Sequence, residues 1–156
     1  MKAFLPYGGY WASPFARWQG ELAHLHAIEF AAYVTRHALA ARSISPDAFD
    51  YGAYGLTVIQ KSCFYGVPWF GGLIGANALT GPTIHQACAT GARLLAAAAG
   101  EIATAGAKAA LVVSGDRCSN GAHVVYPAPH APGGTADSEN WEIGRASCRE
   151  RVYACV

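Results

Sequence analysis

The chain has 156 residues, of which 53% are hydrophobic and 13% are charged. This composition is that of a folded domain with an apolar core, and it excludes a disordered segment. Eleven Lys and Arg residues nearly balance ten Asp and Glu residues, which leaves a net charge of +1. So small a charge does not favour binding to nucleic acid or to an anionic membrane surface, and we expect neither as a partner.

Hydrophobic patterning predicts strands and helices in alternation over the first half of the chain. Residues 2–6 form a short apolar run that we interpret as a strand, and aromatic and β-branched residues predict another strand over 54–60. Apolar residues recur at helical spacing over 21–42, which indicates an amphipathic helix. A serine before a proline predicts a helical turn over 46–49. We expect a second helix over 69–79.

The second half begins with a strand, a helix and a strand in succession. The strands are predicted over 83–87 and 109–114, and the alanine-rich helix over 90–105, with Gly106 as its C-terminal stop. Helices that alternate with strands in this way are typical of an α/β fold, a largely parallel sheet with helices on its faces. Prolines and glycines after Gly115 predict a loop.

Residues 142–156 differ from the rest of the chain, because they carry five charged residues in a short segment. The run EIGRASCRERV, residues 142–152, resembles the in-frame translation of a sequencing adapter. We therefore expect this tail to be an artefact outside the fold, and the natural chain to be broken off near Trp141.

The cysteines and one long uncharged stretch bear on the cellular location. Five cysteines occur, at positions 63, 88, 118, 148 and 155, without a Cys-x-x-Cys pair. Their odd number, without a signal peptide, predicts a reducing cytoplasm.

Residues 62–92 carry no charge, but prolines and glycines interrupt them. A spanning helix needs about 20 predominantly apolar residues, so we expect no membrane span.

Cys88, between the strand over 83–87 and the helix over 90–105, is the strongest candidate for chemistry. In an open α/β sheet the reactive groups lie outside the carboxyl ends of the strands, where helix N-termini point. The partial positive charge there favours a thiolate, and the same backbone amides can stabilise an oxyanion. Gly91 leaves room for a tight turn and a substrate. Position alone leaves open the alternative of a buried, structural cysteine.

The other cysteines and the histidines indicate no second site. Cys63 and Cys118 are expected to be structural or incidental. Two combinations offer metal ligands: His85 with Cys88, and Cys118 with His123 and His130. Neither has the second close pair that completes a zinc spacing, so we expect no metal. His24 and His26, two residues apart on a helix, face in different directions.

A family resemblance rests on TIHQACATGARLLAAAAGEIATAGAKAALVVSGDR, residues 83–117. This segment resembles the nucleophile region of the thiolase family, where a strand leads to a reactive cysteine, a small-residue turn, an alanine-rich helix and another strand. YGGYWASPFARWQGE resembles the family's first loop, and AIEFAAYVTRHALAARSISPDAFD its first helix and the following turn. The likeness runs to about residue 141. It implies an N-terminal α/β core over 1–115 and, over 116–141, the start of a loop insertion above the active site.

The resemblance implies acyl transfer between coenzyme A thioesters, a reaction of lipid metabolism. Cys88 would attack an acyl-CoA or 3-oxoacyl-CoA to give an S-acyl enzyme, and a second thioester or free CoA would accept the acyl group. Coenzyme A thioesters would be substrates, with no covalently bound cofactor. The whole protein would be a homodimer or a dimer of dimers.

The chain also departs from the thiolase pattern. The family's activating histidine and its second, acid/base cysteine come from the C-terminal half, and neither motif occurs here. His85, His123 and His130 lie in no matching segment and are not assigned these roles. Ala-Thr-Gly, residues 89–91, replaces the usual Gly-Ser-Gly turn, as in outlying thiolases that resemble the sterol-carrier type, and leaves acyl chain length open. We expect no thiolase turnover from this chain alone.

Two other interpretations stay open. A condensing enzyme resembling ketoacyl synthases also has a cysteine at this junction, with different downstream histidine or asparagine residues. The chain can also be a non-catalytic fragment that offers only a surface. A truncated fold should leave the helices over 21–42 and 90–105 partly uncovered.

Overall fold

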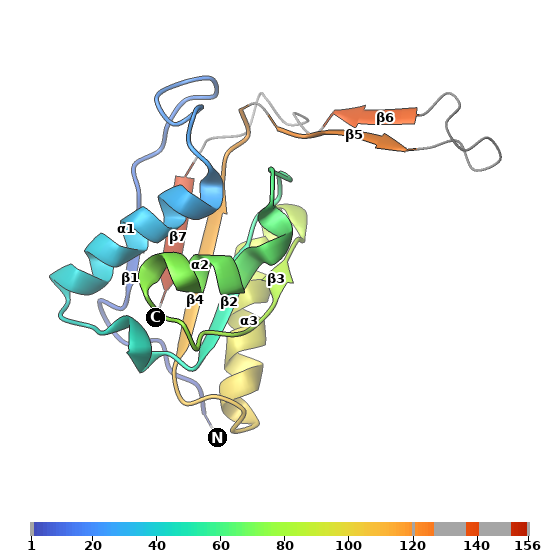
Figure 1. Ribbon diagram of the computed structural model, residues 1–156. Coiled ribbons are helices and arrows are strands. Elements are labelled where there is room, and N and C mark those ends of the chain that lie inside the picture. Colours follow the sequence, from blue (N-terminus) through green and yellow to red (C-terminus); the bar gives the residue numbers. More distant parts are fainter. Residues whose placement is uncertain (1, 120, 127–136, 141–150, 156) are drawn as a thin grey trace.

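A five-stranded sheet forms the centre of the molecule, with helices on both of its faces (Figure 1). The computed structural model describes residues 2–119, 121–126, 137–140 and 151–155. In spatial order, the strands of the sheet are β1 (Tyr10–Ala12), β7 (Arg151–Cys155), β4 (Ala110–Asp116), β2 (Tyr51–Gly55) and β3 (Thr83–Ile84). β2 pairs in parallel with both β3 and β4, whereas β7 pairs antiparallel with β4 and β1. The predicted α/β fold, with a mixed sheet between helices, is therefore confirmed.

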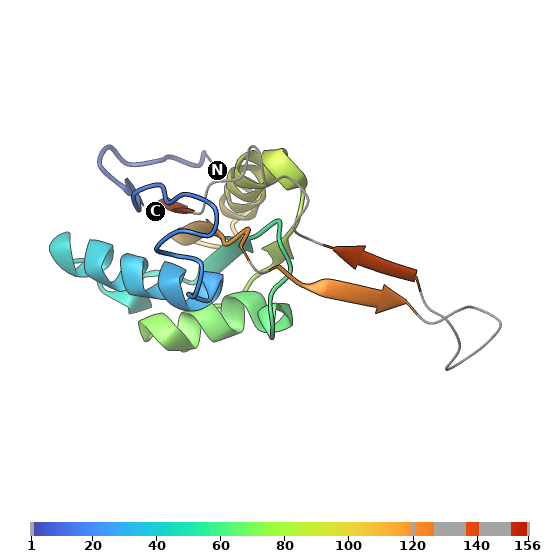
Figure 2. The same ribbon diagram turned by 90° about the horizontal axis from the view of Figure 1, so that it is seen from above.

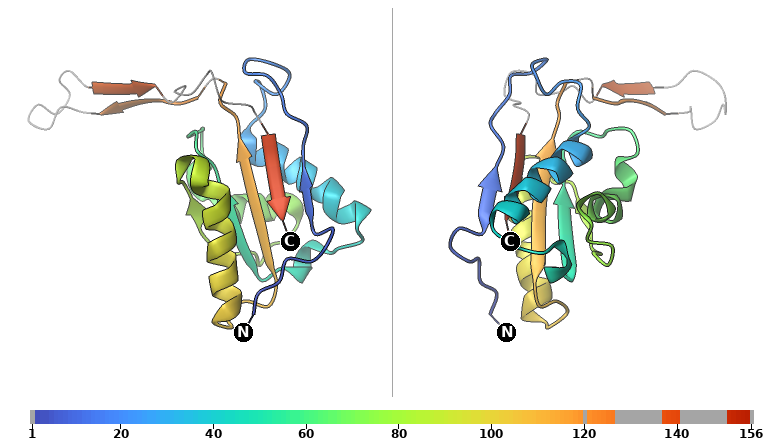
Figure 3. Two further views of the ribbon diagram at one scale, coloured as in Figure 1. Left: turned by 180° about the vertical axis from the view of Figure 1, so that it is seen from behind. Right: turned by 60° about the vertical axis from the view of Figure 1, so that its left-hand side comes forward.

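The helices form two layers, which Figure 2 shows from above. One layer holds α1 (Ala27–Ala41) and α2 (Gly66–Ile74), and the other holds α3 (Thr90–Ala103). The described residues also include three short 3₁₀ turns: η1 (Pro46–Ala48), η2 (Cys63–Tyr65) and η3 (Ala87–Ala89). Figure 3, from behind, shows α3 lying along the face opposite α1 and α2.

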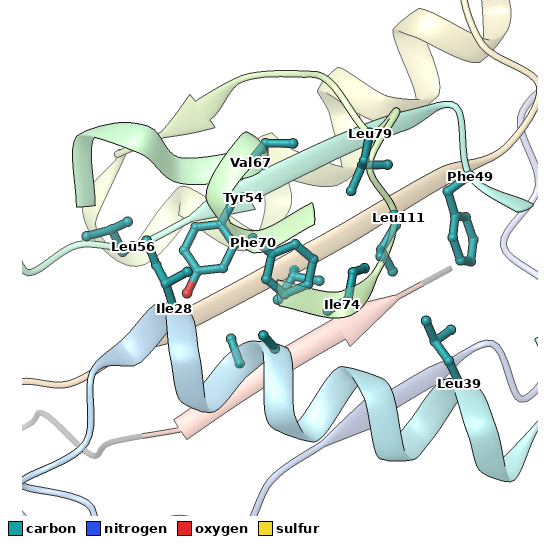
Figure 4. Packing of buried hydrophobic residues seen from close by; sticks show 14 of the residues in the cluster. Ile28, Leu39, Phe49, Tyr54, Leu56, Val67, Phe70, Ile74, Leu79 and Leu111 are labelled. Carbon is teal, nitrogen blue, oxygen red and sulfur yellow. The ribbon is translucent and has the colours of Figure 1, made fainter. Parts of the chain in front are cut away.

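Alternating side chains along the strands build a separate core on each face of the sheet, because successive residues of a strand point to opposite sides. Leu111 and Val113 of β4 and Tyr54 of β2 pack under α1 and α2. Figure 4 shows this larger cluster, in which the rings of Tyr54 and Phe70 lie 5.5 Å apart. The intervening residues of the two strands face α3 and form a second, smaller cluster with it. This cluster consists of Ala53, Leu94, Ala98, Ala110 and Val112.

One face of α3 is uncovered. Leu94 and Ala98 are buried against the sheet, whereas Gly91, Ala92 and Ala96 are exposed and Leu95 is 41% exposed. An apolar outer face of this kind agrees with the expectation of a partly uncovered helix.

Several element boundaries differ from the prediction. Residues 2–6 are not a strand, and the first strand is β1. The first helix begins at Ala27, where His26 Nδ1 accepts a hydrogen bond from the amide of Ile28 and so caps the helix. The second strand is β2 rather than 54–60. The predicted turn at Ser45 is confirmed, since its side chain accepts from the amide of Asp47.

Residues 151–155, within the tail that the sequence sets apart, form β7 between β4 and β1. Their pairing with β4 runs from Val112 opposite Cys155 to Asp116 opposite Arg151. A strand edge offers backbone donors and acceptors that an extended segment of almost any sequence can satisfy. The origin of residues 142–156 therefore stays a prediction.

A two-stranded antiparallel ribbon, β5 (His123–Tyr126) with β6 (Asp137–Asn140), projects from the sheet (Figures 1 and 2). It lies within residues 116–141, for which the thiolase resemblance implies a loop insertion. The described part of this segment therefore contains regular structure.

Candidate active site

Cys88 lies where the carboxyl end of β3 passes into α3. It is the middle residue of η3, between Ile84 at the end of β3 and Thr90 at the start of α3, as predicted. Its side chain is exposed. The alternative of a buried structural cysteine therefore does not apply. Parallel pairing places the carboxyl ends of β2 and β4 at the same edge of the sheet.

Thr90 closes the turn that carries Cys88. Its Oγ1 accepts a hydrogen bond from the amide of Gln86 at 2.9 Å and donates one to the carbonyl oxygen of Ala87 at 2.7 Å. The amide of Thr90 also donates to that carbonyl, and the amide of Ala89 donates to the carbonyl of Gln86 at 3.0 Å. These hydrogen bonds join the residues before Cys88 to those after it and so fix the shape of the turn.

Ala87, directly before Cys88, has a φ of +45°. A residue with a Cβ rarely adopts this left-handed conformation, because the side chain crowds the backbone. Strain of this kind persists only where the surrounding contacts impose it, and it is concentrated at functional sites.

Gly55, the last residue of β2, lets Thr90 approach the sheet. A Cβ atom at Gly55 would lie 2.5 Å from Thr90 Cγ2 and 2.6 Å from Leu94 Cδ1, closer than real Cβ atoms come. At Gly91, by contrast, an added Cβ would meet nothing within 4 Å. The space beside Gly91 is therefore open, in agreement with the expected room next to Cys88.

Asp116, at the carboxyl end of β4, joins that strand to the loop after β2. Its carboxylate accepts hydrogen bonds from the amide of Thr57 at 2.8 Å, from the amide of Val58 at 3.0 Å and from the Thr57 hydroxyl. Burial raises the pKa of Asp116 above its ordinary value, and these hydrogen bonds and the charge of His85 offset part of the rise. Sequence reasoning did not single out Asp116; the only signal was an acidic residue at the end of a buried strand.

The remaining predicted residues lie elsewhere or outside the described structure. Cys63 and Cys118 are both buried. His26 caps the start of α1, and its Nε2 lies 2.7 Å from the carbonyl oxygen of Lys61. The side chain of His123 and all of His130 lie outside the described residues. Over the part of the chain that the structure describes, no three His, Cys, Asp or Glu side chains gather as metal ligands would.

An open hollow of about 660 Å³ lies beside the start of α1. Its lining consists of His26, Glu29, Lys61, Ser62, Tyr65, Pro68 and Trp69. None of these residues belongs to η3 or to the first turn of α3.

Comparisons with known proteins bear on the fold. No protein-family model and no curated protein sequence matches the chain. Among solved structures, human mitochondrial 3-ketoacyl-CoA thiolase superposes with a TM-score of 0.73 and 20% identity, over 83% of this chain and 34% of that protein. The Acat5 thiolase of Ascaris suum, solved with coenzyme A, gives 0.72 and 16% identity, over 85% of this chain and 35% of that one.

The chain has part of the thiolase fold. An acetyl-CoA acetyltransferase from Syntrophomonas wolfei agrees, with a TM-score of 0.63 and 22% identity over 74% of this chain and 29% of its own. The chain thus spans about a third of the length of the thiolases it matches. This confirms the predicted resemblance to part of the thiolase fold. Among the described helices, none is long and apolar enough to cross a membrane.

Proposed function

We propose that Cys88 is the nucleophile of an acyl transfer between coenzyme A thioesters, through an S-acyl-cysteine intermediate. The observation that carries this proposal is the position of the thiol. Cys88 is exposed at the N-terminal end of α3, beside the carboxyl edge of β2, β3 and β4, in a chain with part of the thiolase fold. Helix N-termini present amides that favour a thiolate and can hold an oxyanion.

The first half of the reaction needs no redox step. The Cys88 thiol gives its proton to water, and the thiolate attacks the carbonyl carbon of the thioester. A new carbon–sulfur bond forms, and the charge on the carbonyl oxygen is held by the amides at the start of α3. The tetrahedral intermediate then collapses, the bond to the CoA sulfur breaks, and CoA leaves as a thiolate that takes up a proton.

Coenzyme A thioesters are the proposed substrates because two of the structural neighbours were solved with coenzyme A: the Ascaris suum thiolase and a second structure of the human mitochondrial enzyme. We propose no covalent cofactor. For the whole protein we propose a role in lipid metabolism and a homodimer or a dimer of dimers.

The second half of the reaction needs a group that activates the accepting thioester or CoA. The thiolase motifs that supply the histidine and the second cysteine do not occur in these 156 residues. We therefore propose that this chain by itself forms the acyl enzyme and does not turn over. Losses near a million-fold are on the order seen when one member of a catalytic unit is removed.

The test is acylation of the purified chain with acetyl-CoA, followed by peptide mass spectrometry. We expect an acetyl group on Cys88, released by neutral hydroxylamine as a thioester is. The variant Cys88→Ala should lose it, while Cys63→Ala, the matched control at a buried thiol, should keep it. An unmodified Cys88 in the folded chain, or equal acetylation of Cys63 and Cys118, would contradict the proposal.

A further inference from the structure

We infer that Thr90 is a positioning residue for Cys88: its hydroxyl holds the turn in the shape that places the thiol at the N-terminus of α3. The importance of Cys88 rests on the function proposed above, but the geometry of the turn and its test do not. Thr90 itself lies beside the reacting thiol and needs no contact with substrate.

The hydroxyl of Thr90 makes hydrogen bonds to both of the residues that precede Cys88. It accepts from the amide of Gln86 and donates to the carbonyl of Ala87, at 2.9 and 2.7 Å. Thr90 is only 5% exposed, so water competes little for these bonds. Together they fix the backbone on both sides of the peptide that joins Gln86 to Ala87.

The left-handed backbone of Ala87 shows why such a restraint is needed. With φ at +45°, this residue would relax toward a negative φ if the turn were free to move. A change of φ at Ala87 would swing Cys88, the next residue, relative to the first turn of α3. The thiol would then lie differently with respect to the amides at the start of α3.

Other groups near the turn do not replace Thr90. Arg93 Nε donates to Gln86 Oε1 at 3.2 Å, but this bond is exposed and involves side chains only. Asp116 holds the neighbouring loop after β2. The charged or titratable groups that flank η3 are His85 before it, Arg93 on α3 and Asp116 at the end of β4. All three residues are retained in the variants at Thr90, which change no charged side chain.

The two branches of the Thr90 side chain have separate functions, which makes the inference testable. Cγ2 packs toward Gly55, and Oγ1 makes the hydrogen bonds. Thr90→Val keeps the branched shape and removes the hydroxyl. Thr90→Ser keeps the hydroxyl and removes the methyl group.

The experiment measures the rate of Cys88 alkylation by iodoacetamide at pH 7, peptide by peptide. In Thr90→Val we expect this rate to fall roughly threefold, the size of a helix-terminus effect on one charge. Thr90→Ser should keep the wild-type rate even if the loss of its methyl group lowers the melting temperature.

A Thr90→Val chain whose Cys88 is alkylated at the wild-type rate would overturn the inference. If Thr90→Val does not fold, Thr90→Ser still decides: a folded Thr90→Ser chain with the reduced rate would show that the methyl group, and not the hydroxyl, sets the reactivity. The failure of the proposed function is distinguishable, because alkylation uses no coenzyme A. Cys88 could fail to accept acetyl from acetyl-CoA while its alkylation still depended on the Thr90 hydroxyl.

Discussion

Ala87 stands in a conformation that glycine adopts at less cost. We expect Ala87→Gly to leave the free energy of unfolding unchanged or to raise it by up to about 1 kcal/mol, because relief of the positive φ offsets the greater entropy of glycine in the unfolded chain. Ala89, two residues later, has a φ of −87°. Ala89→Gly relieves nothing and should lower the free energy of unfolding by about 0.4–1 kcal/mol.

Urea unfolding of both variants measures this difference. Equal destabilisation by the two glycines would mean that Ala87 is not strained in solution. The pair also separates strain from flexibility, since both substitutions loosen the same turn.

At the scale of single residues, the sequence identifies Cys88 but not the residues that hold its turn in place. A cysteine between a strand and an alanine-rich helix is visible in the pattern of residue types. Thr90 matters because its hydroxyl reaches back to residues 86 and 87, and Asp116 because it accepts from Thr57 and Val58. Contacts across 58 residues, such as that between Asp116 and Val58, are made by the folded sheet and have no local signature.

At the scale of elements, Asp116 joins β4 to the loop after β2, and it makes the free energy of unfolding depend on pH. Its pKa is raised in the folded state, so its contribution to stability is largest below the unfolded pKa and is lost as pH rises through the folded pKa. We expect Asp116→Asn to remove this dependence. The free energy of unfolding of the wild type, relative to Asp116→Asn, should therefore decline between pH 4 and pH 7.

Asp50 is the matched control, with the opposite sign. Its carboxylate accepts from the amides of Ala109 and Lys108, and these hydrogen bonds lower its pKa. The stability that it contributes is present above the unfolded pKa and is lost as pH falls through the folded pKa. Relative to Asp50→Asn, the wild type should gain stability as pH rises to about 4, and the difference should change little between pH 4 and pH 7. Parallel behaviour of the two variants would refute the account of Asp116.

The elements themselves were predictable where the local pattern was strong. The helix over 90–105 is α3 to within two residues, because alanine and leucine favour a helix whatever surrounds it. β2 was placed too late in the chain because it contains Gly52 and Gly55, which weaken the strand pattern. Both glycines are required by packing: an added Cβ at Gly52 would lie 2.9 Å from Leu79 and Val67.

Across the whole molecule, the place of β7 can be tested directly. Tyr153 is paired with Ala12 on one side and with Ser114 on the other, so β7 is an interior strand of the sheet. Proline is tolerated in edge strands and not at such a position. If β7 completes the sheet, Tyr153→Pro should lower the free energy of unfolding by roughly 2–3 kcal/mol. Tyr153→Ala, which keeps the backbone N–H, should lower it by less.

The same measurement decides whether the tail contributes to the fold. If residues 142–156 lie outside the fold, as their composition suggests, Tyr153→Pro and Tyr153→Ala should both have the same midpoint of urea unfolding as the wild type. Hydrogen exchange at β4 gives a second readout, because the amides of β4 that face β7 should lose protection in the proline variant only.

Pairing of β1 with β7 also sets the order in which the sheet can assemble, because Tyr10 lies opposite Cys155. At about 5–20 residues per second, ribosomal synthesis releases β1 on the order of ten seconds before β7. β2, β3 and β4 can pair during that interval, since all three precede residue 117. Until β7 arrives, the outer edge of β4 presents unpaired amides and carbonyls, and a second nascent chain can pair with it. The chain is therefore most prone to aggregate in the interval after β4 has formed and before β7 has paired with it.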